Sequence, residues 1–401
     1  MKQNDIYQES VALHKKLKGK LEIHSKVKLN NTHDLSLAYT PGVAEVCRAI
    51  AEDHTKAYDL TMKNNSIAIV SDGSAVLGLG NIGPYAAIPV MEGKAILFKE
   101  YANINAYPIC VQTQNAYEII NLVKNIAPAF AGINLEDIAA PRCFEIEEAL
   151  QDIGIPVFHD DQHGTAIVLL AALINAAKLA GKNLQDLVVV VNGAGAAGTA
   201  IADLLRCVGQ DKRVCEPVKD VIVCDSKGII TSNRPDIINN RHKRRLASIS
   251  NRSKKNGGLI DAIVGADVFI GVSKANLVTK EMIKKMNTKP IVFAMANPTP
   301  EIMPDEALEA GAFIVGTGRS DFPNQVNNVL AFPGIFRGAI DARAKTITNN
   351  MKIGAAFALA SAIKHPKKDK ILPSPLDKNV AVKIAAKVAE IYSTNDMEPS
   401  A

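Results

Sequence analysis

The sequence has 401 residues, which is long enough for two domains that each bury a core. Its 47% hydrophobic and 22% charged residues are typical of a packed soluble protein and exclude a disordered chain. The net charge of +5 is concentrated in residues 234–255, which contain no aromatic residue to stack on bases, so a nucleic-acid partner is not favoured. We interpret this basic segment as a solvated surface helix or loop; a local site for a cofactor phosphate or another anion is the alternative.

The N-terminus and the cysteines favour a cytoplasmic protein. Residues 1–5 lead directly into charged residues, without the apolar stretch of a signal peptide. The longest apolar run, residues 166–177, is broken by Asn175 and is short for a membrane span, so we expect a buried core helix there. The six cysteines, at positions 47, 110, 143, 207, 215 and 224, form no C-x-x-C pair. They predict buried reduced thiols rather than a disulfide framework or a zinc site.

The first part of the chain alternates strand-like and helical segments. Helices are expected at residues 6–17 and after Pro41 and Gly42, because proline suits a first helical turn. Short apolar runs predict further elements. The expected strands are residues 66–70, 95–98, 107–111 and 155–158, and the expected helices are residues 115–126 and 143–150. Strands that alternate with helices predict a largely parallel sheet with covered faces.

A second α/β unit begins after residue 161 with a long apolar helix. Its expected strands are residues 187–191, 220–224, 266–270, 290–294 and 312–315, and its last helices are residues 345–364 and 377–392. The fold class is therefore α/β with two domains. An N-terminal α/β domain is expected over residues 1–161, and a Rossmann-like doubly wound parallel sheet with C-terminal helices over residues 162–401.

The pattern G-x-G-x-x-G occurs at residues 78–83 and again at residues 193–198. The first copy runs into Pro84 and Tyr85 rather than into a clean amphipathic helix, so we expect no dinucleotide there. The second copy leaves a buried strand and opens a helix, which is how backbone N–H groups at a helix N-terminus bind a pyrophosphate. The predicted cofactor-binding turn consists of Gly193, Ala194, Gly195, Ala196, Ala197 and Gly198.

Asp225 ends the next expected strand and bears on the choice of cofactor. An acid at this position accepts hydrogen bonds from the adenosine ribose hydroxyls and disfavours a 2′-phosphate, which predicts NAD. Its distance from Gly193 exceeds the usual ~20 residues, and we assign the extra length to a surface insertion at residues 210–217. Lys227 keeps NADP open, because its ammonium group could hold the 2′-phosphate.

Adjacent acids follow two expected strands, at residues 136–137 and residues 160–161. The carboxyl ends of strands are where open α/β sheets bind ligands, and several carboxylate oxygens suit Mg²⁺ or Mn²⁺. For either pair alone, a helix N-cap or a solvated turn is the alternative. Zinc binding by His159 and His163 is not favoured. The zinc-protease pattern needs both histidines on an established helix, which is not expected here, and the sequence shows no third soft ligand.

Seven blocks of the chain resemble the malic enzyme family, the shorter bacterial type, in the family's order and over nearly the full length. They are residues 37–43 (LAYTPGV), 72–83 (DGSAVLGLGNIG), 89–94 (PVMEGK), 132–137 (GINLED), 158–166 (FHDDQHGTA), 296–298 (ANP) and 317–328 (TGRSDFPNQVNN). The resemblance implies oxidative decarboxylation of L-malate to pyruvate and CO₂, with reduction of NAD or NADP and a divalent metal. It makes residues 1–161 the catalytic domain and residues 78–83 one of its blocks.

The resemblance also implies roles for single residues. Lys94 is expected to accept the malate hydroxyl proton and Tyr39 to protonate the enol product. A lysine can be this base only if its pKa falls from ~10 towards neutrality, which burial beside a divalent cation would favour. The expected metal ligands are Glu136, Asp137 and Asp161. The expected substrate contacts are Asn297, which also faces the nicotinamide, Asn327, Asn328 and Ser74.

One position departs from the family pattern. Larger members carry an arginine that binds a malate carboxylate where this sequence has Ala75, next to Ser74. The resemblance further implies a homodimer in which the cleft takes a residue from the neighbouring chain, with no nucleic-acid or membrane partner. Two other functions stay open: a hydroxy-acid dehydrogenase that stops at the keto acid, which needs no metal, and a non-catalytic NAD-binding regulator whose basic segment binds nucleic acid.

Overall fold

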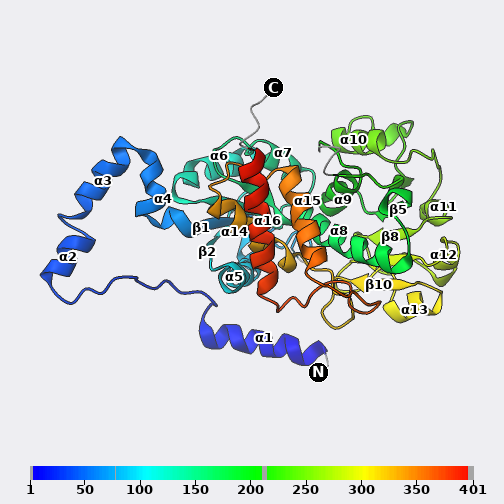
Figure 1. Cartoon of the computed structure of the whole chain (residues 1–401), viewed down its shortest axis with the longest axis horizontal. Helices are drawn as coiled ribbons and strands as arrows, with labels where there is room; N and C mark the ends of the chain where they lie inside the picture. Colours follow the sequence, from blue (N-terminus) through cyan, green and yellow to red (C-terminus); the bar gives the residue numbers. More distant parts are fainter. Residues whose placement is uncertain (1–2, 77, 210–214, 396–401) are drawn as a thin grey trace.

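The structure, a computed structural model, describes residues 3–76, 78–209 and 215–395. Two sheets with helices on their faces form the body of the protein, and an N-terminal arm extends from it (Figure 1). The helices of the arm and the first domain are α1 (Gln3–Leu17), α2 (Thr32–Ala38), α3 (Val43–Glu52), α4 (Ala57–Leu60), α5 (Gly83–Ala102), α6 (Ala116–Ile126) and α7 (Arg142–Glu148). The later helices are α8 (Asp160–Ala180), α9 (Ala196–Leu205), α10 (Arg241–Ile249), α11 (Leu259–Ile263), α12 (Lys280–Lys284), α13 (Pro304–Glu309), α14 (Phe332–Asp341), α15 (Asn349–Ser361) and α16 (Asn379–Asn395).

The first sheet has four parallel strands in the order β2-β1-β3-β4. The strands are β1 (Ser66–Ser71), β2 (Asn105–Cys110), β3 (Gly132–Leu135) and β4 (Val157–His159). Strands β1 and β3 are fully buried, as expected for central strands whose two faces are covered by helices. The predicted strands at residues 66–70, 107–111 and 155–158 are therefore confirmed.

The strand predicted at residues 95–98 is wrong, because this run lies inside the 20-residue helix α5. The buried positions of α5 recur with the helical period of 3.6 residues, and the four apolar residues are one part of that longer stripe. The helix begins at Gly83 with Pro84 in its first turn. Residues 78–83 therefore do lead into a helix, but the strand that follows, β2, ends at Cys110 and not at an acid.

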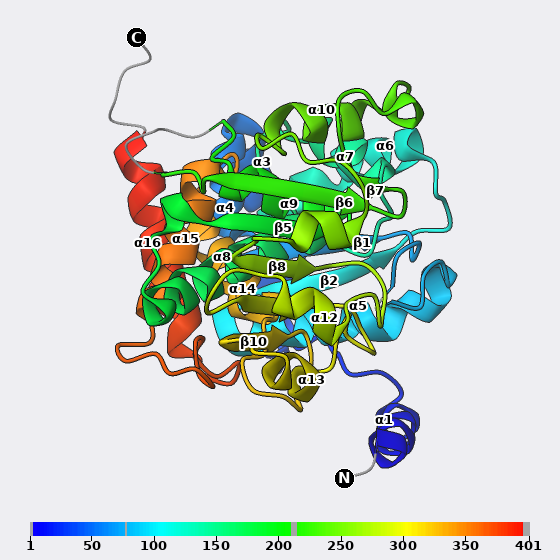
Figure 2. The ribbon, with the colours of Figure 1, turned by 90° about the vertical axis from the view of Figure 1, so that its right-hand side faces the viewer.

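The second sheet has the order β10-β9-β8-β5-β6-β7, and all its pairs are parallel except β6 with β7. Its strands are β5 (Val188–Asn192), β6 (Asp220–Asp225), β7 (Gly228–Ile229), β8 (Val268–Gly271), β9 (Ile291–Ala294) and β10 (Ile314–Thr317). Helices α8 and α9 cover one face, and α11, α12 and α13 cover the other (Figure 2). The predicted doubly wound sheet and its five strands are confirmed, whereas the two-residue β7 carried no periodic signal.

Helix α8 connects the two sheets and is the core helix that the apolar run predicted. By length and composition alone it could cross a membrane, but most of it is buried inside the protein, where it packs against α9 and α15. The C-terminal helix α14 packs against α5 of the first sheet, with the rings of Phe98 and Phe332 4.7 Å apart. The C-terminal helices therefore contact elements from both halves of the chain.

The arm comprises α1, α2, α3 and the segments between them, and it lies outside the body (Figure 1). None of the residues of α2 and α3 is buried. The arm nevertheless exposes many large apolar side chains, among them Ile23 (85% exposed) and Leu37 (65% exposed). Lys20 is one point of contact with the body, since its Nζ donates to the carbonyl of Pro89 at 2.8 Å. The arm therefore presents a large exposed apolar surface, which is unusual for a single chain.

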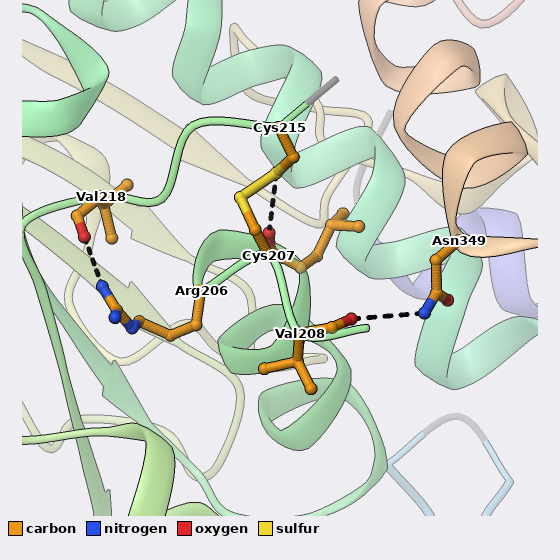
Figure 3. Close-up of a disulfide and its surroundings, with 7 residues drawn as sticks. Arg206, Cys207, Val208, Cys215, Val218 and Asn349 are labelled. Atoms are coloured by element: carbon orange, nitrogen blue, oxygen red, sulfur yellow. Dashed lines mark hydrogen bonds between the residues drawn. A yellow bond between two sulfur atoms is a disulfide. The ribbon is translucent and has the colours of Figure 1, made fainter. Parts of the chain in front are cut away.

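Cys207 and Cys215 form a disulfide, so the prediction that all six cysteines are reduced is wrong (Figure 3). The bond joins the end of α9 to the segment that leads into β6. The neighbouring Arg206 supports the same connection, because its Nη1 donates to the carbonyl of Val218 at 2.6 Å. The eight-residue spacing of the two cysteines matches no recognisable motif. They are brought together because the segment after α9 leads back into strand β6. Residues 210–214 of the predicted insertion lie outside the described residues.

Candidate active site

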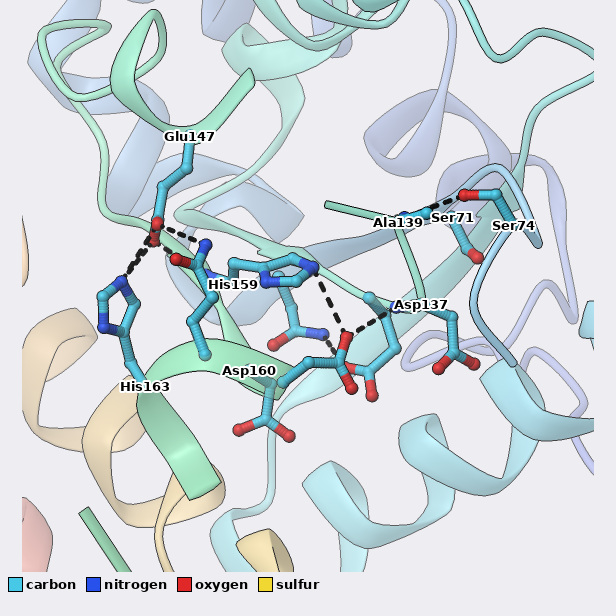
Figure 4. A network of polar contacts seen from close by, with 12 residues as sticks. Ser71, Ser74, Asp137, Ala139, Glu147, His159, Asp160 and His163 are labelled. Carbon is cyan, nitrogen blue, oxygen red and sulfur yellow. Dashed lines mark hydrogen bonds and ion pairs between the residues drawn. The ribbon is translucent and has the colours of Figure 1, made fainter. Parts of the chain in front are cut away.

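Three predicted metal ligands meet at the carboxyl ends of β3 and β4. Glu136 and Asp137 follow β3, and Asp161 lies in the first turn of α8, directly after β4. One oxygen of each carboxylate lies within 4.8 Å of the others, and this is the one such cluster found among the described residues. Asp161 Oδ2 also accepts a hydrogen bond from the backbone N–H of Asp137 at 2.8 Å (Figure 4). Two strands that are neighbours in the sheet thus bring together acids that are 24 residues apart in the sequence.

The environment of these carboxylates fits a hard divalent cation. Glu136 and Asp137 are each only 4% exposed. Burial raises the pKa of Glu136 and of Asp161, and in both cases a neighbouring acid adds to the increase. Buried carboxylates that lie this close together lack hydration and repel one another. Mg²⁺ or Mn²⁺ would offset both costs, and the all-oxygen donor set suits either ion.

Lys94 reaches this cluster from α5. Its Nζ lies 2.9 Å from Glu136 Oε1 and 2.5 Å from Asp160 Oδ2, and it sits 4.1 Å from the centre of the Phe332 ring. Burial alone would lower the pKa of Lys94, but the attraction of Asp160 and Glu136 outweighs it and raises the pKa above its usual value. The lysine is therefore held protonated in the protein by itself. A cation on Glu136 would weaken this hold and bring the pKa down.

The structure gives the adjacent acids Asp160 and Asp161 different partners. Asp160 is fully buried and pairs with Lys94, whereas Asp161 belongs to the cluster of three carboxylates. Consecutive helix residues point about 100° apart, which separates the two side chains. Of the flanking histidines, His163 bonds Glu147 at 2.9 Å and takes no part in the cluster. The pairing of Asp160 with Lys94 had no signal in the sequence.

Ser74 stabilises the loop beside the cluster. Its hydroxyl donates to Asp72 Oδ1 at 2.5 Å and accepts from the backbone N–H of Ala139 at 2.8 Å (Figure 4). The hydroxyl proton is thus already engaged, although Ser74 was predicted to contact substrate. Arg142, which the sequence analysis did not single out, pairs with Asp72 at 3.1 Å.

Loops from the two halves of the chain meet over the site. A Cβ atom on Gly78 would come within 2.5 Å of the Asn297 carbonyl oxygen, so the first glycine motif lies against the loop after β9. Asn328 is close to the first turn of α8, since a Cβ atom on Gly164 would lie 3.2 Å from its Cβ. Asn327 caps the short 3₁₀ helix that begins at Asn328, and its Oδ1 accepts from the N–H of Val329. The structure thus brings Asn297 and Asn328 to the boundary between the two sheets.

The second glycine motif forms the strand–turn–helix that was predicted. It runs from β5 into α9, with Gly195 at the N-cap position of the helix. A Cβ atom on Gly198 would lie 1.7 Å from the Gly193 carbonyl oxygen, so no other residue fits there. The N-terminus of α9 carries backbone N–H groups without partners inside the helix, which suit a pyrophosphate. This geometry fits a dinucleotide.

Asp225 has more partners than a ribose-binding acid would have. Both its oxygens bond Arg234, at 2.9 Å each, and Oδ2 also bonds Lys243 Nζ at 2.6 Å. The backbone N–H of Lys227 donates to Oδ1 at 2.9 Å. A carboxylate offers about four lone-pair positions, and four donors occupy them here. Burial alone would raise the pKa of Asp225, but the bonds from Arg234 and Lys243 outweigh it and lower the pKa.

Tyr39 does not lie with Lys94 in this chain. It forms the C-cap of α2 in the arm and is 68% exposed, whereas Lys94 is buried in the body. Figure 1 shows α2 at the far end of the arm from α5. The site within one chain therefore contains the three carboxylates, Lys94 and the predicted dinucleotide-binding turn. The predicted acid, Tyr39, lies away from it.

Comparisons with known proteins agree with this geometry. The family model "Malic enzyme, N-terminal domain" matches residues 18–118, and "Malic enzyme, NAD binding domain" matches residues 162–393. The bifunctional malic/malolactic enzyme of Bacillus subtilis is 57% identical over 96% of this chain and 92% of its own length. The NADP-dependent malic enzyme of Halomonas elongata is 45% identical over 94% of this chain and 90% of its own length. A crystal structure of the NAD-dependent malic enzyme from Thermotoga maritima is 50% identical and has a TM-score of 0.90, covering 94% of this chain and 98% of that one.

Proposed function

The chain belongs to the malic enzyme family, and from this premise we propose that it oxidises and decarboxylates L-malate to pyruvate and CO₂ with a nicotinamide cofactor and Mg²⁺ or Mn²⁺. The observation that carries the proposal is the contact of Lys94 with Glu136, a member of the carboxylate cluster. A metal-free dehydrogenase would need no such cluster. A regulator would need neither the cluster nor the buried lysine.

Different residues of the site have different roles in the proposed reaction. Glu136, Asp137 and Asp161 would hold the divalent cation, which would supply Lewis-acid chemistry for the malate hydroxyl and for the negative charge that develops when CO₂ is lost. Lys94 takes the hydroxyl proton at Nζ, and Asp160, 2.5 Å away, holds the ammonium group in position. Asn297 and Asn328 orient the substrate where the two halves of the chain meet. The turn at residues 193–198 holds the cofactor pyrophosphate at the N-terminus of α9.

Initial-rate kinetics with L-malate test this proposal, with NAD and NADP each crossed with Mg²⁺ and Mn²⁺. We expect pyruvate and reduced cofactor in equal amounts, and no turnover after metal removal with a chelator. Oxaloacetate as the end product would indicate a simple dehydrogenase. Lactate without net reduced cofactor would indicate the second activity in the name of the B. subtilis relative. Absence of any product in all four combinations would contradict the proposal.

We propose that the enzyme uses both NAD and NADP. The sequence favoured NAD because Asp225 was expected to bind the ribose hydroxyls, and that preference stays a prediction. In the structure Arg234 and Lys243 neutralise Asp225, so the carboxylate has little charge left to repel a 2′-phosphate. Lys227 lies on the same side, with its Nζ 3.3 Å from Asp236 and 65% of its side chain exposed. These cations support acceptance of NADP.

Replacing Lys243 with glutamine should therefore shift the cofactor preference towards NAD. The change removes a cation that could bind the 2′-phosphate, and it leaves a position on Asp225 for a ribose hydroxyl. A charge-assisted hydrogen bond contributes about 1.5–3 kcal/mol, so kcat/KM for NADP should fall about tenfold or more while that for NAD is unchanged or rises. Arg252→Gln is the matched control, since it removes one charge from the same basic segment and its exposed side chain makes no hydrogen bond or ion pair in the described structure. Equal losses with both cofactors would contradict the proposal.

We also propose a homodimer in which each arm supplies Tyr39 to the partner's site. The exposed apolar side chains of the arm and the distance of α2 from Lys94 support an exchange of arms between two copies. An isologous dimer makes this exchange reciprocal, so that both sites are completed at once. Each active site would then contain residues from two chains.

A further inference from the structure

A cavity of about 460 Å³ lies behind the first turn of α8, on the side away from the metal cluster. Residues from α7, α8, α9, α10 and α15 line it, so both halves of the chain contribute. A second cavity of about 160 Å³ shares His163, Asp203, Arg245 and Lys352 with the first. Figure 4 shows His163 and Glu147 on the opposite side of the α8 start from Asp137. No residue of the metal cluster or of the turn at residues 193–198 lines either cavity.

The carboxylates of the larger cavity already have partners. Glu147 accepts from His163 Nε2 at 2.9 Å and from the backbone N–H of His159 at 3.0 Å. Asp203 is paired with Arg245 through both oxygens, at 2.8 and 2.9 Å. Glu148 at the rim is paired with Arg241. These acids therefore offer little that would attract a cation into the cavity.

Two side chains of the cavity have hydrogen-bond donors to spare, because the Lys352 ammonium group has three N–H donors and only the His163 ring as an acceptor among the described residues. Lys352 Nζ lies 3.3 Å from each ring nitrogen of His163, and no carboxylate is within ion-pair distance of it among the described residues. Burial lowers the pKa of Lys352, and the more distant carboxylates of Glu147 and Asp203 offset this effect only in part. Thr199 is 5% exposed, and its hydroxyl has no hydrogen-bond partner in the described structure. An anion would satisfy the remaining N–H donors of Lys352 and the Thr199 hydroxyl, which has no partner in the described structure.

We propose that this cavity binds a small anion, a carboxylate or a phosphate, with Lys352 Nζ and Thr199 Oγ1 as its main donors. The guanidinium groups of Arg241 and Arg245 extend the positive lining. The volume suits a small metabolite. Because α7 connects β3 to β4 of the first sheet, while α9, α10 and α15 belong to the second half, the bound anion would contact both halves at the back of α8. Such a site is separate from those for malate and for the cofactor.

Titration calorimetry on the metal-free full-length protein tests the site, with inorganic phosphate in one series and succinate in another. We expect at least one of them to bind, and the two series distinguish a phosphate from a carboxylate ligand. Lys352→Met should weaken binding at least tenfold, as expected for loss of a charged donor. Thr199→Val keeps the side-chain shape and removes only the hydroxyl, so it should weaken binding several-fold.

Two controls test whether a loss of anion binding could arise from unfolding or from the loss of any positive charge. The melting temperature of unliganded Lys352→Met should equal or exceed that of the parent protein, because the substitution removes a poorly compensated cation. Lys383→Gln on the exposed side of α16 removes a charge that makes no ion pair in the described structure, and it should bind like the parent protein. The proposal fails if neither anion binds at millimolar concentration. It also fails if Lys352→Met and Thr199→Val both bind as tightly as the parent protein.

Discussion

Substitution of Lys94 by arginine should abolish malate oxidation while leaving the fold intact. The guanidinium group can keep the ion pairs with Glu136 and Asp160, but it cannot lose a proton near neutral pH. General base catalysis contributes about 10²–10⁴-fold, so kcat for malate should fall by that factor. Steady-state kinetics and thermal unfolding, measured on the same preparation, give the two quantities that this prediction separates.

A partial reaction distinguishes a base from a structural lysine. Decarboxylation of added oxaloacetate requires no removal of a hydroxyl proton, so Lys94→Arg should keep much more of this activity than of malate oxidation. Lys99→Ala on the exposed side of the same helix is the control, because within the described residues its Nζ hydrogen-bonds to the side chains of Asn103 and Asn105 and to no group of the site. If both reactions fell equally in Lys94→Arg, the lysine would act by organising the site and not as the base.

Two inactive variants should restore activity when they are mixed. Tyr39→Phe removes the proposed acid, and general acid catalysis again predicts a loss of about 10²–10⁴-fold in kcat. If the arm of one chain completes the site of the other, a mixed dimer of Tyr39→Phe with Lys94→Arg contains one intact site. Random reassociation at equal concentrations makes about half of the dimers mixed, so about a quarter of the parent activity should return.

The reassociation needs a control for exchange between subunits. Brief partial denaturation of the mixture, followed by refolding, should give the recovery, and each variant treated alone should stay inactive. Native mass spectrometry of chains with different tags measures the mixed fraction directly. If mixed dimers form and activity stays at the level of the variants, Tyr39 does not act across the interface.

The sequence predicted the two sheets because their strands are long apolar runs between clear breaks. It failed at residues 95–98, where four apolar residues fit a strand and a helix equally well and only the longer stripe of α5 decides. Acids that follow neighbouring parallel strands share one edge of the sheet, and this rule placed the pairs at residues 136–137 and 160–161 together. Pattern and spacing were sufficient for these features, whereas the family resemblance selected Glu136, Asp137 and Asp161, which the structure brings together.

Other features depend on contacts that no local pattern contains. Arg234 and Lys243 reach Asp225 from 9 and 18 residues further along the chain, and nothing in their spacing marks them as its partners. The Cys207–Cys215 disulfide depends on the path between α9 and β6. Tyr39 is isolated because helix α2 buries none of its residues against its own chain, and a one-dimensional pattern does not record this property.

The three predicted metal ligands do not all belong to the same half of the protein, because one of them lies on helix α8. Asp161 lies in its first turn, and the rest of the helix is packed against α9 and α15, whereas Glu136 and Asp137 belong to the end of β3. Any rotation of the cofactor-binding half about this helix changes the distance between Asp161 and the other two ligands. If cofactor binding is accompanied by such a rotation, the affinities for the metal and the cofactor are thermodynamically linked, and each ligand changes the affinity of the other by the same factor.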